Sequence, residues 1–254
     1  MAPGQRSSLR QREGHEASAR ESLAVRLRLL GGFELEVGRK GLDVPPHVQR
    51  LLAFLALHNG PLRRTYVSGR LWLDVGQDKA SASLRTAVWR VRRISAPILE
   101  TTSIDLALAP AVVVDASEVA AIAARCLHGS LDADDVEALV GADELLPGWY
   151  DDWVFQEREH LRQVRMLAVE AACEGLVVAG RYREAETAAL AAVSADPLRE
   201  TARCLLITAH LGTGNRAEAA RQLEDYRARL DCELGLGPSP RILDLARTIG
   251  HSGE

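Results

Sequence analysis

Four arginines, a threonine and a tryptophan lie close together between Asp78 and Ile94, and their side chains suit contact with a nucleic acid. At the 3.6-residue period of a helix, the apolar residues Leu84, Ala87, Val88, Val91 and Ile94 share one side. The opposite side and its flanks carry Arg85, Thr86, Trp89, Arg90, Arg92 and Arg93. Arginine can pair with both acceptors of guanine or with a phosphate, and threonine can donate or accept a hydrogen bond. This face would fit the DNA major groove; a basic face exposed only to solvent is the alternative.

The charge of the chain is unevenly distributed, although the formal net charge of its 254 residues is only −4. Residues 46–96 hold nine lysines and arginines against two acidic residues, a net charge of +7. Residues 97–254 hold 14 basic against 27 acidic residues, a net charge of −13. A basic segment beside an acidic one indicates a nucleic-acid module joined to a module that does not touch nucleic acid.

The elements expected around the arginine-rich stretch are typical of a winged helix-turn-helix domain. They are strands at 25–30, 33–37 and 42–44, helices beginning near Pro46, Thr65 and Asp78, a hairpin at 98–108 and a strand at 112–114. Thr65 and Asp78 are expected to cap their helices. In such a domain the third helix enters the major groove and the hairpin runs beside the backbone.

Four further residues near the third helix are candidate DNA contacts. Arg63 and Arg64 stand just before the second helix, where a helix N-terminus can approach a phosphate. Thr102 and Ser103 form the expected tip of the hairpin. A winged helix can also dock only proteins, but the local charge of +7 favours DNA binding.

The chain from Asp115 onward is predicted to be helical. Helices are expected at 115–127 and 132–140, and about 25 helical residues follow the break at Pro147-Gly148. A repeat then pairs Gly180 with Gly214, Glu184 with Glu218 and Ala185 with Ala219, each 34 residues apart. This is the tetratricopeptide period, and it predicts an antiparallel helical-repeat domain with a surface for protein partners. A helical bundle without a partner groove is the alternative.

No residue pattern typical of an enzyme or a metal site is found. The sequence has no Gly-rich phosphate loop, no GxSxG and no HExxH, so no enzyme, cofactor or metal is expected. Asp134-Asp135 and Asp151-Asp152 lie in acidic surroundings and are expected to be solvated. The cysteines are far apart and are all expected to be small buried residues of helices. They are Cys126, Cys173, Cys204 and Cys232.

The sequence has neither a run of about 18 apolar residues nor the apolar core of a signal peptide. A cytoplasmic protein with no membrane partner is therefore expected. Residues 1–22 lack apolar periodicity and are expected to be a disordered tail. The predicted domains after this tail are a winged-helix DNA-binding domain at 23–112 and an all-α tetratricopeptide-like domain at 113–250. The expected fold class is mainly α with a small β component.

Six motifs over residues 25–249 resemble, in the same order, those of the Streptomyces antibiotic regulatory protein family of bacterial transcription activators. The first half carries VRLRLLGGFELEVGRK, VQRLLAFLALHNG and LRTAVWRVRR. The second half carries PGWYDDWVFQEREHLRQVRMLAVEA, AGRYREAETAALAAVSADPLRETA and ELGLGPSPRILDLA, which look like the family's bacterial transcriptional activator domain.

The resemblance implies a function and partners. Proteins of this family bind direct repeats near promoter −35 elements, usually as side-by-side dimers, and recruit RNA polymerase through its sigma factor and other subunits. The resemblance therefore implies promoter DNA, RNA polymerase and a second copy of the chain as partners. It also implies control of a biosynthetic gene cluster, such as one for an antibiotic.

Two features depart from the family pattern. The wing reads TTSIDLALAP, whereas the family often carries a Gly-Tyr-Arg-like segment there, and this puts minor-groove contact by the wing in doubt. Trp89 is bulky for the reading face, and it could stack on a sugar, contact a thymine methyl or pack against the second domain.

Two other functions stay open at this point. One is an adaptor that binds only proteins through both domains. The other is a ligand-responsive repressor whose helical domain holds a small molecule. The scarcity of aromatic residues between 115 and 229, outside the cluster at 149–155, argues against such a small-molecule pocket.

Overall fold

The computed structural model describes residues 24–58, 60–129 and 133–250, so the expected tail at 1–22 lies outside the described residues. The chain forms two compact units. The first unit comprises the residues up to Glu118 together with Asp143–Arg158, and the second comprises Val119–Ala142 and the residues from Glu159 onward. This division differs from the expected boundary between residues 112 and 113, because the chain returns to the first unit at Asp143.

A four-stranded sheet opens the first unit. Its strands are β1 (Val25–Arg28), β2 (Glu34–Val37), β3 (Lys40–Leu42) and β7 (Val112–Val114), in the order β3-β2-β1-β7. β1 pairs antiparallel with β2 and parallel with β7, so that Leu27 lies opposite both Leu35 and Val114. Alternate residues Val25, Leu27 and Leu29 are buried, as expected for a sheet with one covered face. The strand expected at 42–44 ends at Leu42.

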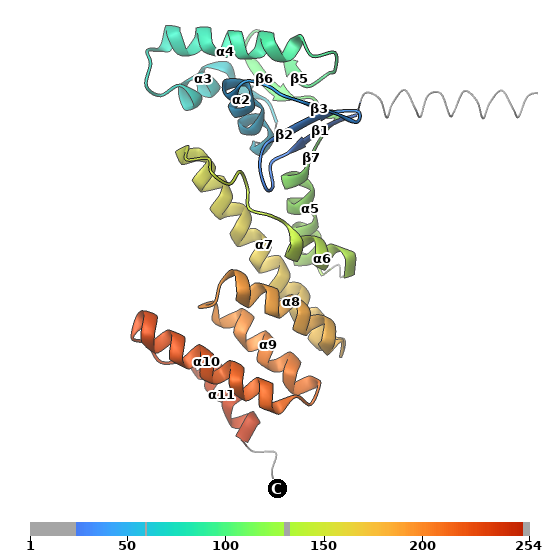
Figure 1. The fold of residues 1–254 in the computed structure, drawn as a ribbon, viewed down its shortest axis with the longest axis vertical. Coiled ribbons are helices and arrows are strands. Elements are labelled where there is room, and N and C mark those ends of the chain that lie inside the picture. Colours follow the sequence, from blue (N-terminus) through green and yellow to red (C-terminus); the bar gives the residue numbers. More distant parts are fainter. Residues whose placement is uncertain (1–23, 59, 130–132, 251–254) are drawn as a thin grey trace, which may run out of the picture. The chain divides into compact units, whose positions relative to one another are not determined.

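Three helices and a hairpin complete the winged helix (Figure 1). The helices are α2 (Pro46–Leu57), α3 (Arg64–Leu71) and α4 (Gln77–Arg92). The hairpin, which we call the wing, pairs β5 (Leu99–Thr101) with β6 (Asp105–Leu108), and β4 (Leu62–Arg63) joins the other edge of β6. Two capping predictions were wrong, because Arg63 and Gly76, without a capping side chain, precede α3 and α4.

The core of the winged helix lies beneath α4. Leu84, Ala87, Val88 and Val91 of α4 are buried, as their helical spacing predicted, while Ile94 is only partly buried. α4 packs against α2 and α3, whose apolar side chains are also buried. They include Leu51, Leu52, Phe54, Leu55, Val67 and Leu71. Burial of this stripe fixes which side of α4 faces away from the core.

The returning segment joins the end of β1 by backbone hydrogen bonds. The N–H of Gly31 donates to Glu144 O over 2.9 Å, and the N–H of Leu146 donates to Leu29 O over 2.8 Å. Arg158 closes the segment by donating to the carbonyls of Leu145, at 2.8 Å, and Leu146, at 2.6 Å. Residues 144–149 form no helix or long strand, so their backbone N–H and C=O groups need other partners. These hydrogen bonds supply such partners.

Aromatic side chains hold the same segment against the winged helix. Trp149 stacks on Phe33 with ring centroids 6.1 Å apart, and Trp153 meets Phe54 edge-on at 5.2 Å. Between them, Asp151 accepts a hydrogen bond from Arg50 of α2. The expectation that Asp151 is merely solvated was therefore wrong, because its partner lies far away in the sequence.

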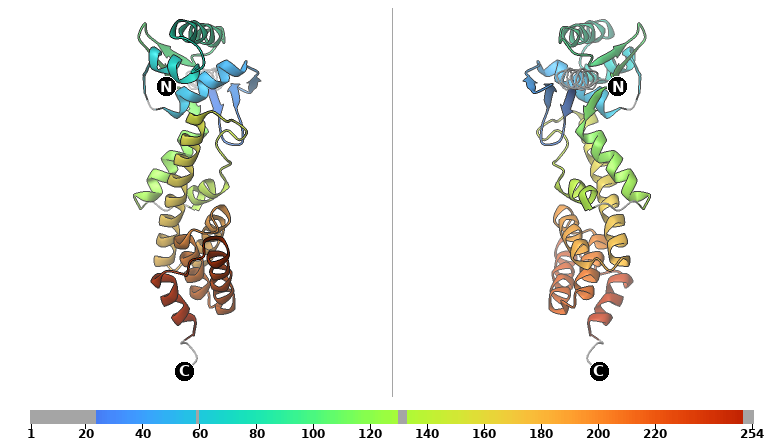
Figure 2. Two further views of the ribbon diagram at one scale, coloured as in Figure 1. Left: turned by 90° about the vertical axis from the view of Figure 1, so that its left-hand side faces the viewer. Right: turned by 90° about the vertical axis from the view of Figure 1, so that its right-hand side faces the viewer.

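The remaining elements are helical and build the second unit. They are α5 (Asp115–Leu127), α6 (Ala133–Gly141), α7 (Asp152–Val178), α8 (Tyr182–Ala195), α9 (Glu200–Gly212), α10 (Arg216–Leu234) and α11 (Pro240–Gly250). α5 and α7 begin in the first unit. α9 packs against α8, α10 and α11 (Figure 2). None of the described helices is long and apolar enough to cross a membrane.

The 34-residue repeat has the same geometry in both copies. Gly180 and Gly214 follow α7 and α9 with positive φ of 72° and 78°, which glycine adopts without steric cost. Ala185 and Ala219 are fully buried one turn into the helices that follow. Small side chains at these positions let antiparallel helices approach closely.

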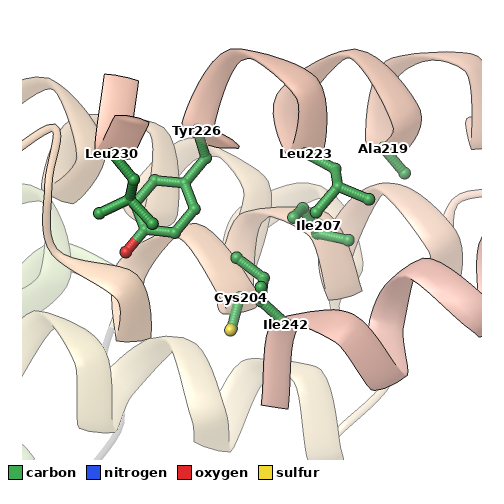
Figure 3. Close-up of a cluster of buried hydrophobic side chains, with 7 residues drawn as sticks. All are labelled: Cys204, Ile207, Ala219, Leu223, Tyr226, Leu230 and Ile242. Atoms are coloured by element: carbon green, nitrogen blue, oxygen red, sulfur yellow. The ribbon is translucent and has the colours of Figure 1, made fainter. Parts of the chain in front are cut away.

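The core of the second unit includes a cluster on α9, α10 and α11 (Figure 3). It consists of Cys204, Ile207, Ala219, Leu223, Tyr226, Leu230 and Ile242. Cys126 and Cys173 are buried as expected, but Cys232 is exposed. The prediction of four buried cysteines was wrong for Cys232 because the buried stripe of α10 passes through Leu223, Tyr226 and Leu230 instead.

Candidate nucleic-acid interface

The side of α4 opposite the buried stripe is exposed and is the centre of the candidate interface. Successive turns place Ala82, Thr86, Trp89 and Arg93 on this side, which we call the outer face of α4, and all four are exposed. Trp89 is 55% exposed, which is unusual for so large an apolar side chain. The outer face thus combines apolar surface with one guanidinium.

The three arginines within α4 lie on the two flanks of the outer face, and Arg93 directly follows the helix. Arg85 and Arg92 share one flank and Arg90 lies on the other, and all three are exposed. Arg92 donates a hydrogen bond to Thr101 Oγ1 of β5, so its flank is next to the wing. A helix in the major groove has one DNA strand on each side, so arginines on both flanks suit phosphate contacts.

Arg90 also affects a residue that the sequence reasoning missed. The pKa of His47, at the start of α2, is lowered by its partial burial and by the positive charge of Arg90. His47 therefore lies within electrostatic range of the candidate interface. Only packing of α2 against α4 brings the two residues together, so no pattern in the sequence could have indicated it.

Trp89 and Arg93 contact one another on the outer face. The guanidinium carbon of Arg93 lies 4.9 Å from the centroid of the indole, a cation–π distance. Thr86, one turn earlier, donates its hydroxyl proton to Ala82 O over 3.1 Å. This bond leaves the Thr86 hydroxyl oxygen as an acceptor and its methyl group as an apolar contact.

The tip of the wing is organised by Thr102. Its hydroxyl oxygen accepts from the N–H groups of Ile104, at 3.1 Å, and Asp105, at 2.8 Å. Thr102 and Ser103 are exposed, as predicted, but this hydroxyl already has a structural role in the turn. Ile104 was expected in the second strand of the hairpin and instead lies exposed at the tip.

Arg63 and Arg64 lie at the base of the wing. Arg63 is in β4, paired with β6, and its Nε is 3.9 Å from Asp105 Oδ1. Arg64 begins α3, is half-buried, and donates its N–H to Ile104 O over 2.9 Å. The structure therefore joins these two predicted residues to the wing rather than to the outer face of α4.

The described residues hold no group of three or more His, Cys, Asp or Glu side chains placed to bind a metal ion. The residues of the candidate interface carry cationic, hydroxyl and aromatic groups. Groups of these kinds can bind phosphates and base edges.

Comparison with known proteins decides the family. Residues 111–250, more than half of the chain, match the family described as "Bacterial transcriptional activator domain". The chain belongs to this family. It is a transcriptional regulator of the Streptomyces antibiotic regulatory protein type, as its motifs indicated.

Two curated relatives of this regulator are named Regulatory protein AfsR. The protein from Streptomyces griseus is 30% identical over 91% of this chain, and that from Streptomyces coelicolor is 30% identical over 98%. The matches cover only 25% and 26% of the relatives. The chain therefore spans about a quarter of their length.

A solved structure shows the same fold. It is Mycobacterium tuberculosis EmbR in complex with low affinity phosphopeptide, with a TM-score of 0.71 and 20% sequence identity. The match covers 89% of this chain and 65% of that chain. The expected fold class, a mainly α chain with a winged helix followed by a helical domain, is confirmed.

Proposed function

We propose that this regulator binds double-stranded promoter DNA in a sequence-specific manner, with α4 in the major groove. The observation that carries the proposal is the outer face of α4, where Trp89 and Arg93 are exposed opposite a buried stripe. Arginines on both flanks supply phosphate contacts that set the register of the helix. The wing, through Thr102 and Ser103, and its base at Arg63 and Arg64 lie along the neighbouring backbone.

We further propose that the bound protein activates transcription by recruiting RNA polymerase, including its sigma factor. Family membership and two relatives named regulatory proteins support this step. The proposal includes a homodimer on direct repeats, control of a biosynthetic gene cluster and action without enzymatic chemistry, and the same membership supports each of these. The helical second unit, tetratricopeptide-like in its 34-residue repeat, supplies the surface for polymerase or for the second copy.

The test is selection of genomic DNA fragments by the purified chain, followed by a mobility-shift titration with the recovered fragments. Arg93→Ala should bind the selected sequence more weakly than wild type does. Arg26→Ala, which removes an exposed arginine from β1, is the matched control and should bind normally. Purified polymerase should then transcribe the selected promoter faster with the wild-type chain than with Arg93→Ala. Failure to enrich any sequence would contradict the proposal and leave the protein-only adaptor as the better reading.

The ligand-responsive repressor has less support from the structure. A hollow of about 480 Å³ lies between α9 and α10, and four of the six residues that line it are charged. They are Arg203, Asp225, Arg229 and Glu233. Small-molecule sites are usually enclosed and mostly apolar, so this open charged hollow is a poor match.

A further inference from the structure

Trp89 and Arg93 form a pair on the outer face of α4. The two residues are one turn apart on the outer face, and the guanidinium lies 4.9 Å from the indole centroid. Both side chains are exposed, and Trp89 lies on the side of α4 opposite the buried stripe. The fold therefore does not use the indole for packing of α4.

The pair has a physical consequence for reading DNA. A free arginine loses much of its side-chain freedom when it binds a base, and this loss weakens binding. Contact with the indole already restricts the guanidinium, so less freedom is lost on binding. The guanidinium keeps several N–H donors, and the acceptors N7 and O6 of guanine are the major-groove pattern that arginine pairs with best.

The indole itself offers an apolar surface beside that guanidinium. In the major groove, thymine is the base that presents an apolar group, its C5-methyl. Ala82 precedes Trp89 by two turns on the outer face and carries only a methyl group, so it leaves space for close approach to the bases. The flanking Arg85, Arg90 and Arg92 supply the phosphate contacts on either side.

We propose that Trp89 and Arg93 together read a thymine adjacent to a guanine, with the indole covering the thymine methyl and the guanidinium binding the guanine. Trp89 is then both a specificity-determining residue and the positioning residue for Arg93. This inference rests on the proposed function. It assigns a base step to a residue that would otherwise contact only sugar or protein.

The experiment uses the full chain and a duplex recovered by selection with the wild-type protein. Each thymine of the duplex is replaced in turn by deoxyuridine, which removes only the methyl group. Wild type should lose about fourfold in affinity at one thymine, the effect expected for burial of one methyl-sized group. The neighbouring guanine, replaced by 7-deazaguanine, should weaken wild type but not Arg93→Ala.

Variants of the pair separate positioning from simple contact. Trp89→Ala should bind about tenfold more weakly and should not respond to the same deoxyuridine, while Trp89→Phe should keep part of the response. The double variant Trp89→Ala/Arg93→Ala should bind about fourfold more weakly than Arg93→Ala, because only the contact with the thymine methyl remains to be lost once Arg93 is absent. This further loss is smaller than the tenfold loss of Trp89→Ala alone, so the two losses do not add. Arg85→Ala, from the flank, should keep the full deoxyuridine response and lose affinity for all duplexes alike.

Two results would overturn the inference while leaving the proposed function intact. One is a wild-type protein that binds the duplex but responds to no deoxyuridine beside a guanine. The other is a Trp89→Ala variant with the wild-type deoxyuridine response or with losses that simply add to those of Arg93→Ala. Failure of the wild type to select any duplex would overturn the proposed function as well. Melting temperatures equal to wild type show that the variants are folded, and Trp89→Phe carries the test if Trp89→Ala melts early.

Discussion

The guanidinium of Arg50, on α2, donates a hydrogen bond to the carboxylate of Asp151, which lies 101 residues further along the chain. Both side chains are partly buried, between the ring contacts that Trp149 and Trp153 make with the winged helix. The pair therefore joins the start of α7 to the helix that packs beneath α4.

Removing this ion pair should destabilise the first unit. Arg50→Ala leaves the Asp151 carboxylate without its cationic partner, and hydrogen bonds to charged groups that are only partly exposed contribute about 1–2 kcal/mol. The free energy of unfolding of the full chain, measured by urea titration, should fall by that amount. Asp152→Asn, at the exposed neighbouring position, is the control and should leave it unchanged. Equal stability of Arg50→Ala and wild type would mean that the aromatic contacts alone hold α7.

A fragment that ends at Val112 should be less stable than one that ends at Arg158. The shorter fragment lacks Asp115, whose carboxylate accepts from the N–H of Leu29, at 2.9 and 3.0 Å, and of Leu30, at 3.0 Å. It also lacks Trp153, so Phe54 loses a ring partner. The sequence predicted a DNA-binding domain at residues 23–112, which the shorter fragment contains. We now expect fragment 1–158 to melt at a higher temperature and to bind selected DNA more tightly; identical melting would show that the returning segment adds nothing.

Val88→Asp should unfold the winged helix. Val88 is 5% exposed on the buried stripe of α4, and an ionised carboxylate there has no partner, at a cost of several kcal/mol. Thr86→Asp is the matched control, since it adds the same charge on the exposed side of the same helix. Circular dichroism melting should show a cooperative transition for Thr86→Asp. A cooperative, wild-type-like melt of Val88→Asp would contradict the helical phase.

Arg93 and Arg63 should differ in the kind of binding they supply. Arg93→Ala should lose about 1–3 kcal/mol on the selected sequence only, as expected for a base contact. The side chain of Arg63 is largely exposed, and the 3.9 Å between its Nε and Asp105 Oδ1 is too long for a hydrogen bond. The guanidinium can therefore turn to a phosphate. Arg63→Ala should therefore weaken binding to all sequences alike and reduce the slope of log affinity against log salt by about one. Titrations of selected and unrelated duplexes at several salt concentrations distinguish these two patterns.

One cysteine should react far faster than the others. Burial raises the pKa of Cys173 to about 12 and that of Cys204 to about 11, and it also raises the pKa of Cys126. A thiol reagent at pH 8 should therefore modify Cys232 quickly, and all four thiols only after denaturation. Cys232→Ser should abolish the fast phase. If two or more thiols react quickly in the native wild type, the described packing of the buried cysteines is incorrect.

The same pKa shifts predict that the second unit loses stability at high pH. A folded pKa above the ordinary value means that folding favours the neutral thiol. The stability that the neutral thiols contribute to the folded state is fully present below their ordinary pKa of 9.0, and it is lost as the pH rises toward 11 to 12.

The sequence by itself determined the features that depend on local periodicity. The stripe from Leu84 to Val91 predicted which side of α4 is buried, because the helical period fixes that side from neighbours one turn away. Gly180 and Gly214 likewise marked the repeat, since positive φ at a helix end favours glycine. The order of six motifs was enough to indicate the family.

Only the tertiary structure decided which distant residues meet. The pairing of Arg50 with Asp151, the contact of Arg92 with Thr101 and the nearness of Arg90 to His47 all join different elements. Such contacts leave no periodic signal, because they depend on how helices and strands pack rather than on spacing along one of them. For the same reason, the sequence did not indicate that the chain returns to the first unit at Asp143. The side of α4 that faces outward could be predicted, because it depends only on residues within one helix.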